Sequence, residues 1–125
     1  MRILLDSNIL YWSIIDPEKI SAAVAKILIS RDNEAWVSSV SLAELRIKQC
    51  IGKLKLPDAF DHEVISLGYK MLPFRHEHCH WLAELPLHHR DPFDRMLVAQ
   101  AAEEGLTLLT SDKTLSLYPI ATVLN

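Results

Sequence analysis

Residues 2–8 read RILLDSN, a short apolar run that leads directly into three side chains that favour helix starts. A continuous apolar run is typical of a strand buried on both faces, and Asp, Ser and Asn are preferred where a helix begins. The sequence therefore predicts a buried strand over 2–5 and then a helix from Ile9 that ends at Asp16, the residue before a proline. A second run of the same kind, LTLLTSD at 106–112, predicts another buried strand.

Strand and helix patterns alternate along the rest of the chain. Capping residues, prolines and glycines mark the boundaries, such as Ser41 before one helical segment and Asp91 before another. Further helices are predicted at about 21–30, 41–50, 57–68, 76–84 and 91–104, and strands at about 35–37, 71–72, 107–110 and 120–124. This alternation favours an α/β fold with a parallel sheet covered on both faces. No repeat or linker interrupts it, so we expect a single domain over 1–125.

The composition limits the possible functions. The chain has 125 residues, half of them hydrophobic, which is enough for a substantial core. Its net charge of -3, from 13 basic and 16 acidic residues, excludes a bulk electrostatic binder of nucleic acid but not a local basic patch. There are only 2 cysteines, no apolar stretch long enough to span a bilayer, and an initial apolar run too short for a secretory signal. We therefore expect a cytoplasmic protein with free thiols and no membrane association.

Four acidic side chains are candidates for one site. Asp6 and Asp112 follow the two clearest predicted strands. Glu44 and Asp94 lie in the predicted first turns of two helices. Because open α/β sheets place their sites beyond the carboxyl ends of the strands, we expect these side chains to converge there. Clustered negative charges repel one another unless protons or a cation neutralise them, and Mg²⁺ or Mn²⁺ prefers oxygen ligands, so the set predicts a divalent-metal site.

Each acid also has a purely structural explanation. Asp6 could cap the first helix, and Asp112 could cap a turn. Ser41 and Glu44 have the spacing of a capping box, and Asp94 in a first turn would favour the helix dipole. Capping accounts for each acid separately, but it does not require all four to lie at the same edge of the sheet.

The chemistry that suits a site of carboxylates and metal ions is phosphodiester hydrolysis. Metal ions polarise the phosphate, lower the pKa of a bound water and stabilise the leaving oxygen, so the protein needs only oxygen ligands and a pocket. No nucleophilic arrangement of Ser or Cys is evident in the sequence. Ser7 and Ser111 stand beside two of the acids and could donate hydrogen bonds to them.

Four motifs together carry a resemblance to a known family. They are LLDSN at 4–8, SLAEL at 41–45, LPLHHRDPFDR at 85–95 and GLTLLTSD at 105–112, of which the third is the most specific. With these motifs, nearly the whole chain resembles the PIN-domain ribonucleases of the VapC toxin type, from bacterial toxin–antitoxin pairs. Ser7 departs from the usual Thr, and close relatives often have Trp just before the acid that corresponds to Glu44.

The resemblance implies a three-layer α/β/α sandwich with a mainly parallel central sheet. It implies that the catalytic and metal-binding acids are Asp6, Glu44, Asp94 and Asp112, with Mg²⁺ or Mn²⁺ as the cofactor and RNA as the substrate. It further implies a homodimer that a cognate antitoxin protein holds inactive. Because no acid is missing, it favours a metal-dependent endoribonuclease over the alternative, a catalytically inactive PIN-like module that acts by binding a partner protein.

Histidine-rich segments offer competing interpretations. The segment HEHCH at 76–80 has the spacing of a zinc-protease helix, in which His76 and His80 would bind the metal. Such a short motif often arises by chance, so adventitious metal binding is the simpler expectation. His88 and His89 precede the helix of Asp94, and either could act as a general base, although a loop histidine more often has a structural role.

Basic residues are the candidate contacts for a nucleic-acid backbone. One group is a run without intervening acids, and the other adjoins the acids in sequence: Arg46, Lys48, Lys53 and Lys55, and then Arg90, Arg95 and Lys113. A solvated helix end explains the first group equally well. The tryptophans at 12, 36 and 81 are expected to pack in the core or an interface rather than stack on bases.

Overall fold

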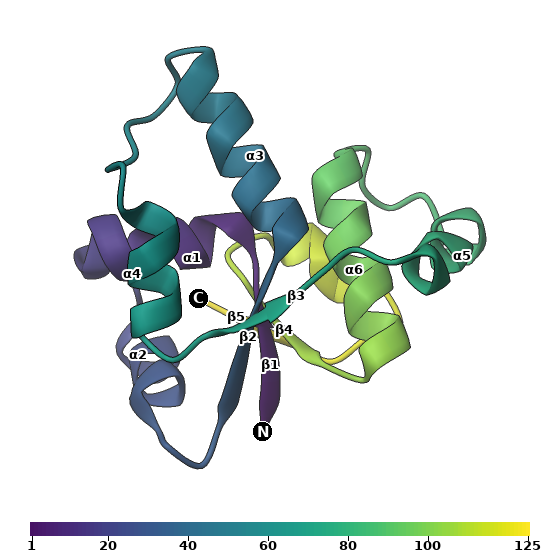
Figure 1. Ribbon diagram of the computed structural model, residues 1–125. Coiled ribbons are helices and arrows are strands. Elements are labelled where there is room, and N and C mark those ends of the chain that lie inside the picture. The colour runs from purple at the N-terminus through teal and green to yellow at the C-terminus, as the bar shows by residue number, and fades with distance from the viewer.

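The computed structural model describes residues 1–125 and contains one five-stranded sheet between layers of helices (Figure 1). The strands are β1 (Arg2–Leu5), β2 (Glu34–Ser38), β3 (Lys70–Leu72), β4 (Thr107–Thr110) and β5 (Thr122–Leu124). Their spatial order is β3-β2-β1-β4-β5, and every neighbouring pair is parallel. The predicted α/β fold with a parallel sheet, arranged as an α/β/α sandwich, is therefore confirmed.

The central strand β1 sends alternate side chains to the two faces of the sheet. Ile3 and Leu5 belong to one buried apolar cluster and Leu4 to the other, and all three are fully buried. In β4, Leu108 and Leu109 likewise belong to opposite clusters. Successive side chains of a strand point to opposite faces, so a strand covered on both faces must be apolar throughout. This is why consecutive residues are apolar in the middle of both strands, Ile3–Leu5 in β1 and Leu108–Leu109 in β4.

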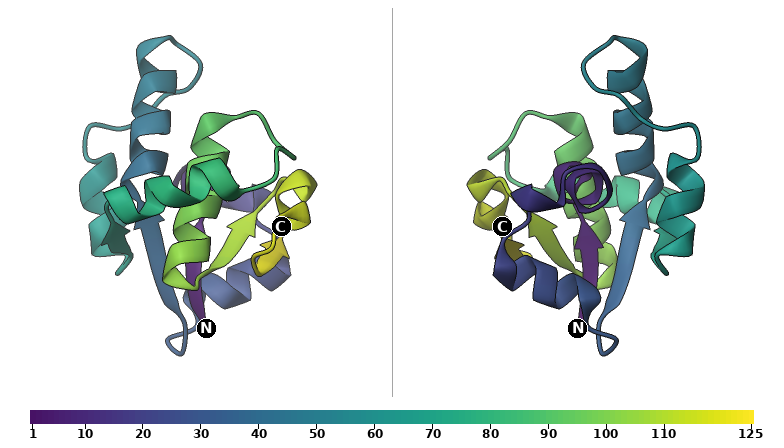
Figure 2. Two further views of the ribbon diagram at one scale, coloured as in Figure 1. Left: turned by 90° about the vertical axis from the view of Figure 1, so that its right-hand side faces the viewer. Right: turned by 90° about the vertical axis from the view of Figure 1, so that its left-hand side faces the viewer.

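Helices cover both faces of the sheet (Figures 1 and 2). On one face lie α1 (Ser7–Ile15), α2 (Ala22–Ile29) and α4 (Phe60–Ser66), and on the other lie α5 (His76–Glu84) and α6 (Pro92–Glu104). The remaining helix, α3 (Ser39–Cys50), follows β2 and projects beyond the carboxyl ends of the strands. Two short 3₁₀ turns occur at Pro17–Lys19 and Lys113–Leu117.

Local capping fixes the ends of several helices as predicted. Asp6 caps α1, which begins at Ser7 rather than at the predicted Ile9, and the hydroxyl of Ser21 caps α2. Asp91 caps α6, with Pro92 in the first helical position, and Gly105 ends it in the left-handed conformation at φ 65°. The bonds involved join residues close together in sequence, so the sequence alone reveals them.

The third helix begins earlier than predicted. The side chain of Ser38 caps α3 by accepting a hydrogen bond from the Val40 N–H, so Ser41 lies inside the helix. The expected capping box of Ser41 and Glu44 is therefore wrong, and Glu44 lies in the second turn of α3 rather than the first. The cause is that β2 runs into α3 without an intervening loop, so a serine nearer the strand takes the capping position.

The fourth helix begins later than predicted. The Phe60 N–H donates to the Pro57 carbonyl at 3.0 Å, and this turn precedes the first residue of α4. Proline can open a turn as readily as a helix because its fixed φ suits both. The predicted end near Gly68 is close to the observed last residue, Ser66, and Gly68 itself has a φ of 85°.

All three tryptophans pack against the core, as predicted. Trp12 contacts the cluster beneath α1, α2 and α4, whereas Trp36 and Trp81 contact the cluster beneath α5 and α6. Their rings therefore contribute apolar contact area rather than an exposed stacking platform. Separately, none of the helices has the length and apolar character that crossing a bilayer requires.

Candidate active site

Asp6 is held rigidly at the end of the central strand. Its Oδ1 accepts from the Ile9 N–H at 2.7 Å, and its Oδ2 accepts from the Thr110 hydroxyl at 2.6 Å and from the Ser111 N–H at 3.3 Å. Thr110 can reach it because β1 and β4 are adjacent parallel strands that end at the same edge. Burial raises the pKa of Asp6, which is only 4% exposed. Asp6 therefore caps α1 and also lies at the edge of the sheet where the other acids meet.

Glu44 reaches the same edge from α3. Its side chain is buried, with 5% of the residue exposed, and its Oε1 accepts from the Ser7 hydroxyl at 2.7 Å. Its Oε2 forms an ion pair with Lys48 Nζ at 2.7 Å, one helical turn further along α3. A buried carboxylate needs such partners because an unpaired buried charge is costly. Each Glu44 oxygen thus has one partner, and Ser7 is one of the two serines expected to bond to the acids.

Asp94 and Asp112 meet at His89. Asp94 lies in the first turn of α6, and Asp112 follows β4. His89, in the loop before α6, has its Nε2 2.8 Å from Asp112 Oδ2 and 3.4 Å from Asp94 Oδ2. One potential ligand atom from each of these residues lies within 4.8 Å of the other two.

The carboxyl of Asp112 is also tied to the turn that follows it. Its Oδ1 accepts from the Thr114 N–H at 2.9 Å, as the capping expectation required. Burial by itself would raise the pKa of Asp112, but the hydrogen bonds from Thr114 and His89 outweigh it and hold the pKa below its ordinary value. The carboxyl of Asp112 therefore ionises more readily than an ordinary aspartate.

Burial and the neighbouring acids both raise the pKa of Asp94. Burial raises its pKa to about 7, and the negative charges of Asp91 and Glu44 add to the effect of burial. Near neutral pH, a substantial fraction of Asp94 therefore keeps its proton. The retained proton shows that too little positive charge lies near these carboxylates to neutralise them. A bound cation would supply that charge.

The four predicted acids line one small pocket beyond the carboxyl ends of the strands. It has a volume of about 100 Å³, and no hydrophobic residue lines it. Its walls are formed by Asp6, Ser7, Asn8, Glu44, Lys48, Asp91, Asp94 and Asp112. Carboxylate oxygens are the ligands that hard divalent cations prefer, so the residues present fit Mg²⁺ or Mn²⁺.

Some residues of the pocket were not predicted as part of it. Lys48 was expected at a solvated helix end or in contact with a nucleic-acid backbone, and Asp91 was expected as a helix cap. Both line the pocket. The spacing of Glu44 and Lys48, four residues apart on one helix, was a readable signal for their ion pair. No comparable signal exists for Thr110, whose bond to Asp6 spans 104 positions of the sequence.

Two of the basic residues expected near nucleic acid have structural partners instead. Arg95 donates to the carbonyls of Pro86 at 2.9 Å and Leu82 at 2.8 Å, and to the Tyr118 hydroxyl at 3.0 Å. These bonds fasten the loop between α5 and α6 to the body of the protein. Arg46 pairs with Asp61 at 3.2 Å and so links α3 to α4.

The histidine-rich helix does not form a comparable cluster. The side chains of His76 and His80 on α5 are 91% and 69% exposed, and each has only a loose carboxylate neighbour, Glu77 at 3.6 Å and Glu84 at 3.4 Å. The only three-residue group of potential metal ligands in the chain is the one at His89. A protease-type zinc site needs three protein ligands, so the geometry does not support one on α5.

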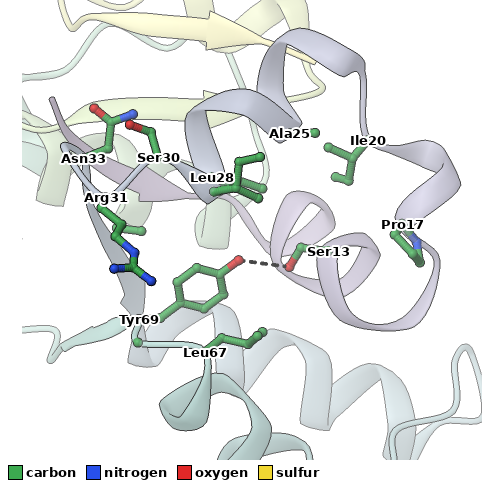
Figure 3. Close-up of a pocket in the computed structure, with 13 residues that line it drawn as sticks. Ser13, Pro17, Ile20, Ala25, Leu28, Ser30, Arg31, Asn33, Leu67 and Tyr69 are labelled. Carbon is green, nitrogen blue, oxygen red and sulfur yellow. Dashed lines mark hydrogen bonds between the residues drawn. The ribbon is translucent and has the colours of Figure 1, made fainter.

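A much larger cavity than the acidic pocket lies elsewhere, between α1, α2 and the end of α4 (Figure 3). Its volume is about 690 Å³, and the residues around it include Ile20, Ala25, Leu28, Arg31 and Tyr69. Residues at the start of β2 and β3 border it, so it opens at the opposite end of the sheet from the acids. It is mainly apolar, and it shares no residue with the acidic pocket.

The sequence pattern that describes the PIN domain matches residues 3–120. The chain belongs to the PIN domain family. The match begins within β1 and extends past Asp112, so this PIN domain contains all four acids of the pocket. No curated protein sequence matches the chain.

Several solved structures are similar to this PIN domain. VapBC2 from Rickettsia felis, bound to a DNA fragment from its promoter, has a TM-score of 0.75 at 21% identity and covers 100% of this chain and 99% of that one. FitAcB from Neisseria gonorrhoeae has a TM-score of 0.66 at 22% identity, covering 100% and 97%. VapBC-5 from Mycobacterium tuberculosis, a member of a toxin–antitoxin family, has a TM-score of 0.59 at 17% identity, covering 98% and 96%. These likenesses establish the shared fold.

Proposed function

We propose that this PIN domain is a Mg²⁺- or Mn²⁺-dependent endoribonuclease and the toxin of a toxin–antitoxin pair. The observation that carries the proposal is the convergence of Asp6, Glu44, Asp94 and Asp112 on one polar pocket. Capping alone would not bring these side chains together, because they come from four separate parts of the chain. The pocket lies where open α/β sheets usually place their sites.

The four acids would hold the metal, directly or through water. A bound divalent ion would supply Lewis acidity toward a phosphodiester and a lowered pKa for water. The protein's own contribution is to fix its ligands: Ser7 holds Glu44, and Thr110 and Ser111 hold Asp6. Hydrogen bonds of this kind orient metal ligands and tune their affinity.

Lys48 gives this pocket a positive side chain at the place where a phosphate would approach. Its Nζ pairs with Glu44 Oε2 at 2.7 Å, and the side chain remains 35% exposed. A metal ion that competes for Glu44 would free Lys48 to contact an anionic backbone. Lys53 and Lys55 follow α3 and are exposed, so they extend the basic surface from Lys48.

Cleavage of a structured RNA pool tests the proposed activity. We expect cleavage by the purified protein with Mg²⁺ or Mn²⁺ and none with EDTA. A parallel preparation of Asp6→Asn, in which Asn can still cap α1, should be inactive. Equal cleavage by both preparations would reveal a contaminating nuclease. No cleavage by wild type that nevertheless binds an antitoxin would favour the inactive, partner-binding alternative.

The antitoxin partner of the proposed pair would occupy the large apolar cavity in Figure 3. The cavity is far larger than the acidic pocket and offers Arg31 and the Tyr69 hydroxyl among apolar side chains. Large exposed apolar surfaces rimmed by polar residues mark sites of protein–protein interaction or ligand binding. Similar solved structures carry the paired names VapBC and FitAB, and VapBC-5 belongs to a toxin–antitoxin family, which supports a protein partner for this fold.

A charge placed in this cavity should weaken antitoxin binding. Ala25 lines the cavity, whereas Ala23 lies exposed on the same helix, α2. We expect Ala25→Glu to weaken binding of the co-expressed antitoxin by at least about tenfold, because a buried unpaired charge is costly. Ala23→Glu is the matched control and should bind normally, as measured by titration calorimetry. Normal binding by Ala25→Glu would place the antitoxin elsewhere.

A further inference from the structure

The ring of His89 lies between the carboxylates of two of the four acids, Asp94 and Asp112, and the place of this residue in its loop is fixed by hydrogen bonds. Its backbone N–H donates to the Tyr118 hydroxyl at 3.0 Å, and Tyr118 is only 2% exposed. Arg95 donates to the same hydroxyl at 3.0 Å and also ties down the preceding loop. The position of the imidazole is thus set by contacts outside the acidic pocket.

The hydrogen bonds of the ring define which nitrogen carries the proton. The Asp91 N–H donates to His89 Nδ1 at 3.0 Å, so Nδ1 presents a lone pair and has no hydrogen. The proton of the neutral ring is therefore on Nε2. Nε2 faces Asp112 Oδ2 at 2.8 Å, with Asp94 Oδ2 at 3.4 Å.

We propose that His89 is a positioning residue, a fixed Nε2–H donor that holds Asp112 in place for the metal. This inference rests on the proposed function only for the identity of the bound ion. Asp112 is then held at both oxygens, by Thr114 at Oδ1 and by His89 at Oδ2. A carboxylate fixed in this way needs less reorganisation to bind a cation.

The same tautomer excludes the two other roles for this histidine. A metal ligand needs a lone pair on the nitrogen that faces the site, and in most such histidines the other nitrogen donates a hydrogen bond. In His89 the polarity is reversed, because Nδ1 accepts from Asp91 and Nε2 donates. A general base would likewise need its lone pair on Nε2. The idea that His89 acts as a general base is therefore not supported.

Two substitutions separate these roles. His89→Gln keeps an amide N–H the same number of bonds from Cβ as Nε2–H, so it retains a donor toward Asp112 but loses the imidazole. His89→Ala loses both. His88→Ala is the matched control, because His88 is an exposed neighbour in the same loop, and its ring meets the Tyr118 ring edge to face at a centroid distance of 5.1 Å.

The first measurement uses the metal-free protein. Nitrogen-15 NMR of the ring should show the proton on Nε2, and the carboxyl carbon signal of Asp112 should shift in His89→Ala but remain near its wild-type position in His89→Gln. A proton on Nδ1, or an Asp112 signal unaffected by His89→Ala, would overturn the proposal. This arm does not depend on catalysis or on any metal.

The second measurement is Mn²⁺ affinity by calorimetry. We expect His89→Ala to weaken Mn²⁺ binding by about 10- to 100-fold, the range for losing a partner that orients a ligand, with His89→Gln within about threefold of wild type. Equal losses in both variants would make His89 a direct ligand and overturn the proposal. Wild type that binds no Mn²⁺ would overturn the proposed function instead, and the metal-free NMR would still decide the role of His89.

Discussion

Asp94→Asn is expected to reduce metal-dependent RNA cleavage by at least about 100-fold, the upper range for losing only an orienting partner of a metal ligand. The change replaces an anionic oxygen of the pocket with a neutral amide and removes one of the four charges that would hold the cation. The start of α6 should be unaffected, because Asp91 and not Asp94 provides its cap. Cleavage rates at saturating Mg²⁺ and Mn²⁺, with circular dichroism to verify the fold, measure the effect.

The control for this prediction is Asp58→Asn, which makes the same chemical change at an exposed residue away from the pocket. It should cleave RNA at the wild-type rate. Expression in a host cell gives a second readout, since the proposed toxin should arrest growth and Asp94→Asn should not. A fully active and fully toxic Asp94→Asn would refute the assignment of the site.

The same substitution should stabilise the metal-free protein at alkaline pH. Burial, assisted by the charges of Asp91 and Glu44, raises the pKa of Asp94 to about 7, whereas an unfolded Asp ionises near about 3.9. Folding therefore favours the protonated form of Asp94. Its contribution to stability is complete below about pH 4 and is lost as the pH rises to about 7. Asparagine is neutral at every pH and avoids this loss.

We expect the free energy of unfolding of Asp94→Asn to exceed that of wild type by about 2–4 kcal/mol at pH 8, with the upper value corresponding to the full pKa shift. The lower value allows for solvent at the side chain, which is 20% exposed. The difference should shrink toward zero near pH 4. Urea unfolding in EDTA at several pH values measures it, and a difference that does not change with pH would rule out ionisation of Asp94 as its cause.

Binding of a divalent metal ion should offset this difference in stability between wild type and Asp94→Asn. An ion that binds only the folded protein stabilises it by about 2.7 kcal/mol at about 100 times its Kd. Wild type should gain this in Mn²⁺, and Asp94→Asn should gain little. The carboxylate that makes the metal-free protein less stable is thus the one that the proposed activity requires, as expected where a functional site is kept at a cost in stability.

Many of the strands and helix ends could be predicted from the sequence because residues close together in the chain determine them. The strands β1 and β4 are centred on the apolar residues Ile3–Leu5 and Leu108–Leu109, and the caps at Asp6, Ser21 and Asp91 involve bonds within a few residues. The alternation of strands and helices then predicted the parallel sheet. The error at the start of α3 has the same origin: Ser38 and Ser41 are both acceptable caps, and the path of β2 decides between them.

The sequence by itself determined which acids are present and that the two strand-end acids should meet at one edge, because parallel strands end together. Only the tertiary structure decided how these acids are paired. The bond from Thr110 to Asp6 joins β4 to β1, and the bond from His89 to Asp112 depends on a loop held by Arg95. Such bonds depend on side-chain conformations that packing fixes, and residues far apart in sequence provide that packing. The acidic pocket was therefore predictable as a set of residues, whereas the raised pKa of Asp94 and the tautomer of His89 emerge only from the folded chain.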